Sequence, residues 1–220
     1  MGARQGSFAA GEYYHLYNRG NSKQKIFHSK HDYERFLKLL YIANSSEKFH
    51  FSDIQNPYEI ERSARLVSIG AYCLMPNHFH LLMTPVNDKE AGVSKFMKKL
   101  GTAYAMYFNT RYERVGSLFE GKFRSEHLDS DRYLKYIFSY VHLNPIKIMD
   151  NKWRELGIKD KNKAWRFLNG YKYSSFYDYQ DKHREEEKIL NKENFPGYFP
   201  SAHKFKEEIF DWLNFSNRKQ

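Results

Sequence analysis

The chain has 220 residues, enough for one sizeable hydrophobic core or for one compact domain with an appended helical piece. Its single cysteine, Cys73, excludes an internal disulfide and a cysteine-based zinc site, so any metal must be bound by nitrogen and oxygen atoms. No apolar run approaches the roughly 18 residues of a membrane span, and no apolar signal segment follows Arg4. We therefore expect a soluble, cytoplasmic protein with no membrane partner.

The charge is strongly positive, because 36 Lys and Arg residues against 26 Asp and Glu residues leave a net charge of +10. Such an excess is compatible with a polyanionic partner. Residues 95–124 carry much of it, namely Lys95, Lys98, Lys99, Arg111, Arg114, Lys122 and Arg124. Aromatic residues make up 18% of the chain, and rings among cations suit single-stranded nucleic acid, which binds by base stacking and phosphate neutralisation. Composition alone leaves open the alternative that the protein does not bind nucleic acid, since basic soluble proteins with aromatic cores are common.

The first third of the chain predicts a strand, a helix and a long connection. Alternating polar and apolar residues indicate a strand over 12–19, closed by a turn at Gly20-Asn21. Apolar residues at three- and four-residue steps indicate a helix over 32–43. Residues 44–65 are polar and show no sustained period, so we expect a long loop there.

The middle of the chain predicts a strand pair followed by a helix. Residues 66–75 and 78–84 are both apolar, and Pro76-Asn77 between them suits a tight turn, so we expect adjacent antiparallel strands. Residues 90–109 show one apolar helical stripe, with Lys95, Lys98 and Lys99 off it.

An extended segment or hairpin over 116–127 should precede a second long helix. Ser130 or Asp131 can cap this helix, which should end where Pro145 forbids continuation. We divide the chain into a catalytic domain over 1–150 and an extension of uncertain role over 151–220.

His78-Phe79-His80 begins the strand that follows the tight turn. Side chains alternate along a strand, so His78 and His80 should face one side and Phe79 the other. Neutral imidazoles are common ligands for divalent metals, and two on one face can serve a single ion. Taken alone, such a pair is more often two ordinary hydrogen-bonded histidines.

The helix after Asp131 offers further groups for the same chemistry. Its core face should consist of Leu134, Ile137, Phe138 and Val141. Tyr133, Tyr136, Tyr140 and Asn144 should lie on one flank and His142 on the opposite flank. Tyr140 and Asn144 are four residues apart and therefore neighbours on the helix surface. A phenol can act as a nucleophile and an amide oxygen can bind a divalent ion. The pattern alone does not choose Tyr140 over Tyr136.

Four segments together resemble a known family. The segment Met75-Pro76-Asn77-His78-Phe79-His80-Leu81-Leu82 resembles the HUH strand of single-tyrosine insertion-sequence transposases. Residues 14–21, 115–124 and 140–145 resemble, in order, the signatures of REP-associated tyrosine transposases, which belong to the same HUH endonuclease superfamily. The motifs cover roughly residues 13–150, and their joint occurrence is far more specific than any one of them.

The resemblance implies an α+β fold, with a ferredoxin-like (RRM-like) antiparallel sheet packed with helices and a mostly helical C-terminal extension. It places the nucleophile at Tyr140, four residues before Asn144, and implies that His78, His80 and Asn144 bind Mg²⁺ or Mn²⁺. The implied activity is cutting and transferring single-stranded, hairpin-containing DNA through a 5′-phosphotyrosine. Relatives include dimers and monomers, and we favour a monomer over a homodimer, with no further small-molecule cofactor.

DNA contacts are expected at the basic residues of segment 95–124 and beside the first turn. The expected set is Asn18, Arg19, Lys95, Lys98, Lys99, Arg111, Arg114, Lys122 and Arg124. For Asn18 and Arg19, a turn-stabilising role is an equal alternative. The main functional alternative is a non-catalytic nucleic-acid-binding module with structural histidines, and a water-using metal hydrolase is a weaker one because the motifs lack acidic ligands.

Overall fold

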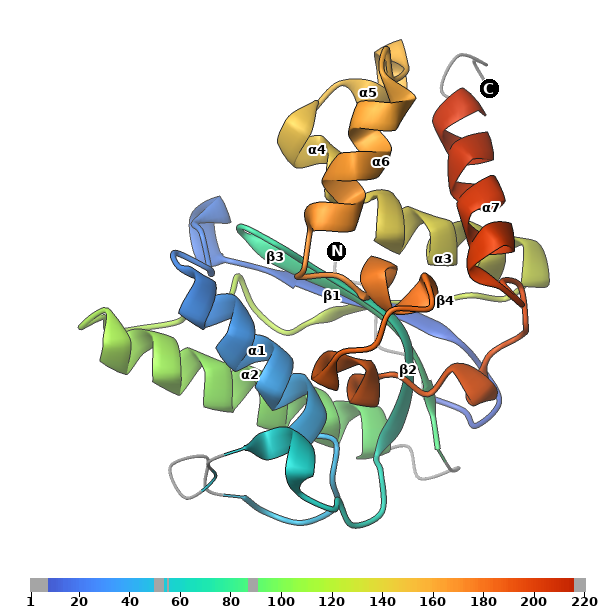
Figure 1. Ribbon diagram of the computed structural model, residues 1–220. Helices are drawn as coiled ribbons and strands as arrows, with labels where there is room; N and C mark the ends of the chain where they lie inside the picture. Colours follow the sequence, from blue (N-terminus) through green and yellow to red (C-terminus); the bar gives the residue numbers. More distant parts are fainter. Residues whose placement is uncertain (1–7, 50–53, 55, 87–90, 216–220) are drawn as a thin grey trace.

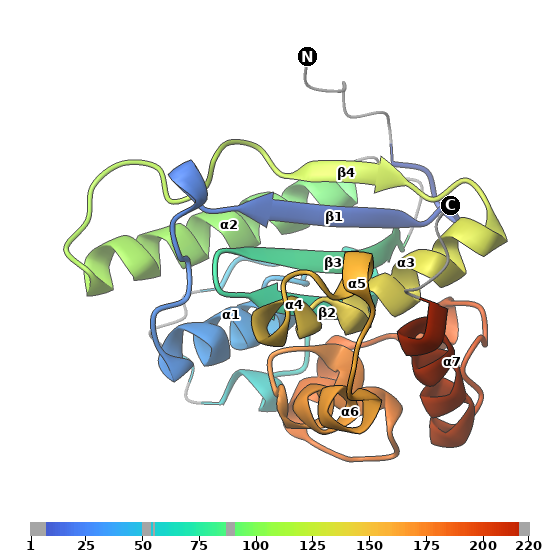
Figure 2. The ribbon, with the colours of Figure 1, turned by 90° about the horizontal axis from the view of Figure 1, so that it is seen from above.

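The computed structural model of the chain describes residues 8–49, 54, 56–86 and 91–215. Within them, four antiparallel strands form one sheet in the order β2-β3-β1-β4, visible side by side in Figure 2. The strands are β1 (Tyr14–Arg19), β2 (Val67–Met75), β3 (His78–Pro85) and β4 (Arg124–His127). The predicted strand pair on either side of Pro76-Asn77 is therefore confirmed.

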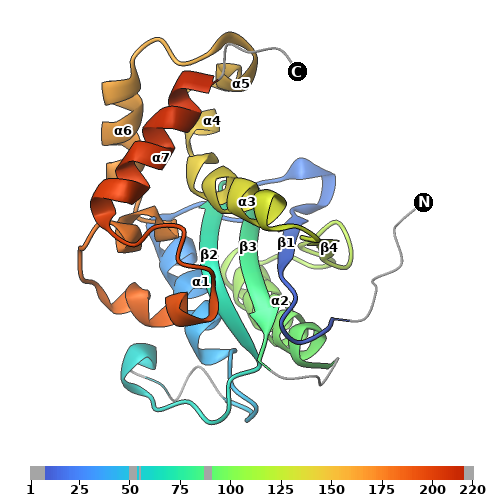
Figure 3. The ribbon, with the colours of Figure 1, turned by 90° about the vertical axis from the view of Figure 1, so that its right-hand side faces the viewer.

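Helices on both sides cover the two faces of this sheet (Figures 1 and 3). Helix α1 (Lys30–Ile42) connects β1 to β2, helix α2 (Ala91–Arg111) connects β3 to β4, and both lie against one face. Helix α3 (Asp131–Leu143) crosses the other face. The order βαββαβ with this strand arrangement is the ferredoxin-like one, which confirms the predicted fold class.

The register of the strands decides which side chains share the α3 face. On β1, His15 lies opposite Leu82, Tyr17 opposite His80 and Arg19 opposite His78. Directly paired residues of antiparallel strands point to the same face, so all six belong to one side of the sheet. The intervening Phe79 packs in the core beneath α1 and α2, as predicted from the alternation.

Two predicted boundaries were wrong. Helix α1 begins two residues before Asp32 because Ser29 is its N-cap and forms a reciprocal capping box with the Asp32 side chain. The Asp32 carboxylate also accepts hydrogen bonds from the hydroxyls of Tyr107 (2.9 Å) and Tyr112 (2.8 Å), which tie α1 to α2.

The segment predicted as extended over 116–127 forms a strand only in its last four residues. Before them the chain turns, with Gly116 at φ +86°, and touches β1 through an isolated bridge between Phe119 and Gly20. The predicted first residue of α2, Glu90, lies outside the described residues.

The long connection 44–65, of which residues 50–53 and 55 are outside the described part, contains the short 3-10 helix η3 (Pro57–Glu59). Buried Asn44 closes it: its Nδ2 donates to the Val67 carbonyl (2.8 Å), and its Oδ1 accepts from the Leu66 and Val67 amides (both 3.0 Å). These three hydrogen bonds join the end of α1 to the start of β2.

The chain after Pro145 is mostly helical, as expected of the extension. It forms α4 (Ile146–Met149), α5 (Trp153–Leu156), α6 (Lys161–Gly170), α7 (Ala202–Phe215) and the 3-10 helices η4 (Ser175–Tyr179), η5 (Glu185–Ile189) and η6 (Lys192–Asn194). None of the helices in the described part of the chain is long and apolar enough to cross a membrane.

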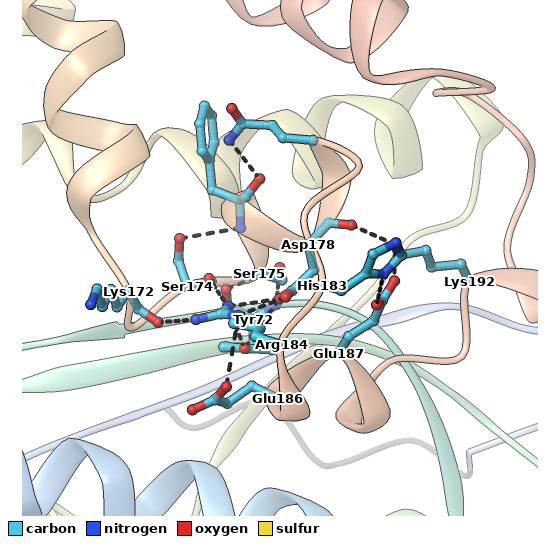
Figure 4. A network of polar contacts seen from close by, with 12 residues as sticks. Tyr72, Lys172, Ser174, Ser175, Asp178, His183, Arg184, Glu186, Glu187 and Lys192 are labelled. Atoms are coloured by element: carbon cyan, nitrogen blue, oxygen red, sulfur yellow. Dashed lines mark hydrogen bonds and ion pairs between the residues drawn. The ribbon is translucent and has the colours of Figure 1, made fainter.

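A buried polar network ties this extension to β2 (Figure 4). The Arg184 guanidinium pairs with the Asp178 carboxylate through Nε (2.6 Å) and a terminal nitrogen (2.7 Å), and it also donates to the Tyr72 hydroxyl (3.0 Å). Nearby, the Phe195 ring lies directly on Gly70, where an added Cβ would come within 2.7 Å of the ring. The extension is therefore packed on the edge strand of the sheet.

We expect Gly70→Ala to destabilise the protein by about 1–3 kcal/mol, because the new methyl group would collide with Phe195. Gly101→Ala is the control, since an added Cβ on that helical residue meets open space and should stabilise by up to about 1 kcal/mol. Urea unfolding measures both. Equal stability of Gly70→Ala and wild type would show that Phe195 does not rest on this strand.

The capping box gives a pH-dependent prediction. Hydrogen bonds from the Tyr112 and Tyr107 hydroxyls and the His28 and Ser29 amides outweigh desolvation and lower the pKa of Asp32. Its stabilising effect is therefore present above the unfolded-state pKa of about 4 and is lost progressively as the pH falls through the lowered folded-state pKa. Asp32→Asn should cost about 1–3 kcal/mol at pH 7. This cost should shrink as the pH falls from 5 to 3 in urea-unfolding titrations, and a cost that does not change with pH would contradict the prediction.

Candidate active site

Three histidines gather on the α3 face of the sheet, at the junction of β1 and β3. The rings of His78 and His80 are 4.9 Å apart and perpendicular, and the His15 ring stacks on His80 at 5.1 Å. His80 and His15 are 5% and 3% exposed, whereas His78 is half-buried. The predicted pairing of His78 and His80 on one side of a strand is thus present, with a third imidazole beside it.

Helix α3 brings a tyrosine to these histidines. Its buried face, formed by Leu134, Ile137, Phe138 and Val141 as predicted, packs on the sheet. The Tyr140 ring is consequently 5.5 Å from His80 and 5.8 Å from His15, edge to face with both. Tyr136 lies one turn earlier and instead contacts the Trp212 ring of α7 at 5.2 Å. Tyr140, and not Tyr136, therefore lies against the histidines.

A hydrogen bond between two histidines orients His80. Nε2 of His15 is 2.9 Å from Nδ1 of His80, and Nδ1 of His15, which makes no hydrogen bond in the described structure, is 3.5 Å from the Glu126 carboxylate of β4. The carboxylate attracts a proton on Nδ1 of His15, which favours the tautomer in which His15 accepts at Nε2 from the Nδ1–H of His80. In that tautomer Nε2 of His80 is an unprotonated lone pair, and this buried atom has no hydrogen-bond partner in the described structure.

His78 is oriented in the same sense by its neighbour in the turn. Its Nδ1 lies 2.7 Å from Oδ1 of Asn77, an oxygen that only accepts. Nδ1 therefore carries the proton and Nε2 is again the lone pair. Both histidines of the motif present the same ring nitrogen in the form that binds a metal.

Burial and neighbouring cations keep these imidazoles neutral. Burial, followed by repulsion from Lys147 and Arg19, lowers the pKa of His78 to about 4. Burial and repulsion from His15 and His78 hold the pKa of His80 well below its usual value. Metal binding requires the unprotonated form, so the site is prepared for a ligand role at neutral pH.

Asn144 supplies an amide one turn beyond Tyr140. It is fully buried, its Nδ2 donates to the Tyr140 carbonyl (2.9 Å), and its Oδ1 has no hydrogen-bond partner within the described residues. A buried, unpaired carbonyl-type oxygen is costly unless a ligand satisfies it. The described chain contains no cluster of three His, Cys, Asp or Glu side chains arranged for a metal, so Asn144 Oδ1 and His80 Nε2 are the two unpaired acceptor atoms that a cation could use.

The lysines of α2 lie in the layer on the opposite side of the sheet from the histidines (Figure 1). The ammonium of Lys95 donates to the Ser46 carbonyl (3.0 Å), and that of Lys99 donates to the Ser45 carbonyl (2.6 Å). Lys98 is exposed. Two of these three predicted DNA contacts thus hold the loop that follows α1.

Arg111 and Arg114 also belong to the α1–α2 layer. Arg111 lies 3.8 Å from the Asp32 carboxylate, and Arg114 donates to the side chain of Gln24 (2.9 Å). The structure does not bring either arginine to Tyr140 or to the histidines within the contacts it describes.

Of the remaining predicted contacts, Arg124 and Arg19 lie on the histidine face, whereas Asn18 is paired with Phe79 and points to the other face. Arg124 is exposed and lies opposite Tyr17, so it points to the same side as His80. Arg19 shares that side but is paired with Glu120 at 2.9 Å. Asn18 donates to the Gly121 carbonyl (3.0 Å), which gives it a loop-stabilising contact, and the adjacent Lys122 is exposed.

Four residues of this site were not predicted from the sequence as site residues. His15 alternates with Tyr17 on the first strand and could have been placed on the histidine face once the pairing of the strands was known. Glu126 pairs with His15 across β4 in the same way. Lys147 and Arg154, which lie over the Tyr140 ring, had no sequence signal, because they come from two short helices whose placement depends on the extension.

Comparison with known families identifies residues 10–144 as an IS200-like transposase domain. The match covers more than half of the chain, so the protein belongs to the IS200-like transposase family, and the resemblance seen in its sequence motifs is confirmed. Among solved structures, a REP-associated tyrosine transposase bound to a REP hairpin is similar, with 12% identity over 84% of this chain and 90% of that chain and a TM-score of 0.48. A comparison with curated proteins finds no match.

Proposed function

We propose that the protein is a metal-dependent single-stranded DNA endonuclease and strand transferase that acts through a 5′-phosphotyrosine at Tyr140. The observation that carries this proposal is the contact of the Tyr140 ring with His80, whose buried Nε2 is unpaired. Membership of a transposase family supports DNA as the substrate. The sequence motifs further suggest that the single strand contains a hairpin.

In the proposed step, the phenol oxygen of Tyr140 forms a bond to phosphorus while the bond from phosphorus to the 3′ oxygen breaks. The phenol loses its proton and the departing 3′ oxygen gains one, so a free 3′-hydroxyl remains. Because the new link is still a phosphodiester, a second 3′-hydroxyl can displace Tyr140 and rejoin the strands without an external energy source. This reversibility suits strand transfer.

His78, His80 and Asn144 are the residues proposed to hold Mg²⁺ or Mn²⁺. When bound, such an ion would supply a Lewis acid that polarises a phosphate oxygen and helps to orient the scissile bond. The chain's own contribution is to present two lone pairs at fixed orientations, through Asn77 for His78 and through His15 and Glu126 for His80.

All the groups proposed for the reaction come from a single chain. Helix α3 packs on the sheet of its own chain, so the nucleophile and the histidines meet without a second copy. This arrangement supports a monomer as the active form. The proposed DNA contacts near the site remain Arg124, Arg19, Asn18 and Lys122. The lysines of α2, together with Arg111 and Arg114, would contact DNA that reaches the α1–α2 layer.

We expect Tyr140→Phe to abolish a covalent protein–DNA adduct and Tyr136→Phe to retain it, because Tyr140 contacts the histidines and Tyr136 contacts Trp212. Labelled hairpin-containing single strands with Mn²⁺ would be scored for adducts that resist denaturation. A 5′-phosphotyrosine requires the adduct on the downstream fragment. Loss of the adduct in Tyr136→Phe alone would reassign the nucleophile to Tyr136, one helical turn earlier. Salt-sensitive binding without any adduct would favour the non-catalytic binding module.

Metal binding can be tested without turnover. We expect His80→Ala to abolish Mn²⁺ binding and His15→Phe to weaken it by about 10- to 100-fold, because the phenyl ring preserves packing but cannot orient His80. His127→Gln is the control, since this histidine lies on β4 next to Glu126 but points to the other face. The readout is the electron paramagnetic resonance signal of free Mn²⁺. Unchanged affinity in His15→Phe would refute the orienting role.

A further inference from the structure

Two cations from the chain beyond the family domain lie over the ring of the proposed nucleophile. The guanidinium carbon of Arg154, on α5, is 4.4 Å from the Tyr140 ring centroid, and the ammonium of Lys147, on α4, is 5.5 Å from it. The region that matches the transposase family ends at residue 144, before either residue. Both cations thus come from the part of the chain that follows the matched region.

These two cations lack a counter-ion among the described residues. No ion pair joins Lys147 or Arg154 to any acidic side chain in the described structure, whereas Arg19 and Arg184 are both paired. Both cationic groups lie within 5.5 Å of the same ring centroid, so the two positive charges repel each other. Such a concentration of unneutralised positive charge is unfavourable until an anion binds.

The fold holds both residues firmly in this arrangement. Pro145 follows the last turn of α3, and the Lys147 amide donates to the Asn144 carbonyl (3.1 Å), which starts α4 immediately beside Tyr140. Trp153, next to Arg154, is only 4% exposed and packs in the core that α6 and α7 share. Arg154 itself remains exposed, so its charge is available to a ligand.

We propose that Lys147 and Arg154 form a phosphoryl-binding site beside Tyr140. In this site the two cations bind the non-bridging oxygens of one DNA phosphate. We take this phosphate to be the scissile one, and that assignment rests on the proposed function of Tyr140. A guanidinium matches two phosphate oxygens at once, while a lysine ammonium acts as a point charge. The chain after Pro145 would then line the active site and supply positive charge at the position of the phosphate.

The test measures DNA binding in a Tyr140→Phe background without divalent metal, so that neither cleavage nor metal binding contributes. A fluorescent 12-nucleotide oligothymidine would be titrated over a range of salt concentrations. Arg154→Gln should reduce the slope of log affinity against log salt by about 0.7, the value of one contact to single-stranded DNA. Arg154→Lys should restore most of the slope, because the charge is retained.

Arg166→Gln is the matched control, because this arginine of α6 is also exposed and makes no described contact with Tyr140. It should leave the slope unchanged, and thermal unfolding should show that all variants fold. An unchanged slope in Arg154→Gln, or an equal loss in Arg166→Gln, would overturn the phosphoryl site. If wild type forms no adduct while Arg154→Gln changes the slope, the phosphoryl site stands and the nuclease proposal is rejected. If Arg154→Gln with Tyr140 intact forms the adduct normally and the slope is unchanged, the nuclease proposal stands and the phosphoryl site is rejected.

Discussion

The packing of α3 on the sheet is the interaction on which the site depends. Leu134, Ile137, Phe138 and Val141 bury their side chains against the face formed by β2 and β3. Each such side chain contributes roughly 1.5–3 kcal/mol when fully buried. This apolar contact fixes the rotation of the helix about its axis, and with it the flank that carries Tyr140. The aromatic contact with His80 is therefore set by hydrophobic packing that is separate from the chemistry.

Two kinds of polar group surround that contact, namely imidazoles that present lone pairs and side chains that carry positive charge. His80 is buried and His78 half-buried, burial lowers the pKa of both, and each ring is hydrogen-bonded through Nδ1 so that Nε2 is left as the lone pair. The cationic groups of Lys147 and Arg154 lie over the ring of Tyr140. Imidazole lone pairs and cations around one phenol are the groups that the proposed metal ion and phosphate would require. The low exposure of His15 and His80 strengthens these interactions, because water screens them less.

The C-terminal extension takes part in this arrangement instead of forming a separate unit. Its buried Asp178–Arg184 pair is bonded to Tyr72 of β2, and Phe195 rests on Gly70 of the same strand. Trp153 joins the end of α3 to α6 and α7 in one core. A buried ion pair contributes little net stability but is costly to break, so the network favours one docking geometry over others. That geometry in turn decides where Arg154 lies.

The sequence by itself determined the order of the elements, the paired faces of His78 and Phe79, and the apolar stripe of α3, because each follows from local periodicity. It also singled out Tyr140 and Asn144 as neighbours on one helix. Only the tertiary structure placed Tyr140 rather than Tyr136 beside the histidines, since the helix-to-sheet contact decides which flank faces which strand. His15, Glu126, Lys147 and Arg154 join the site across sequence separations that no local pattern encodes. The lysines of α2, clustered in the sequence, lie in the layer opposite the histidines because the crossover from β3 to β4 passes over the other face of the sheet.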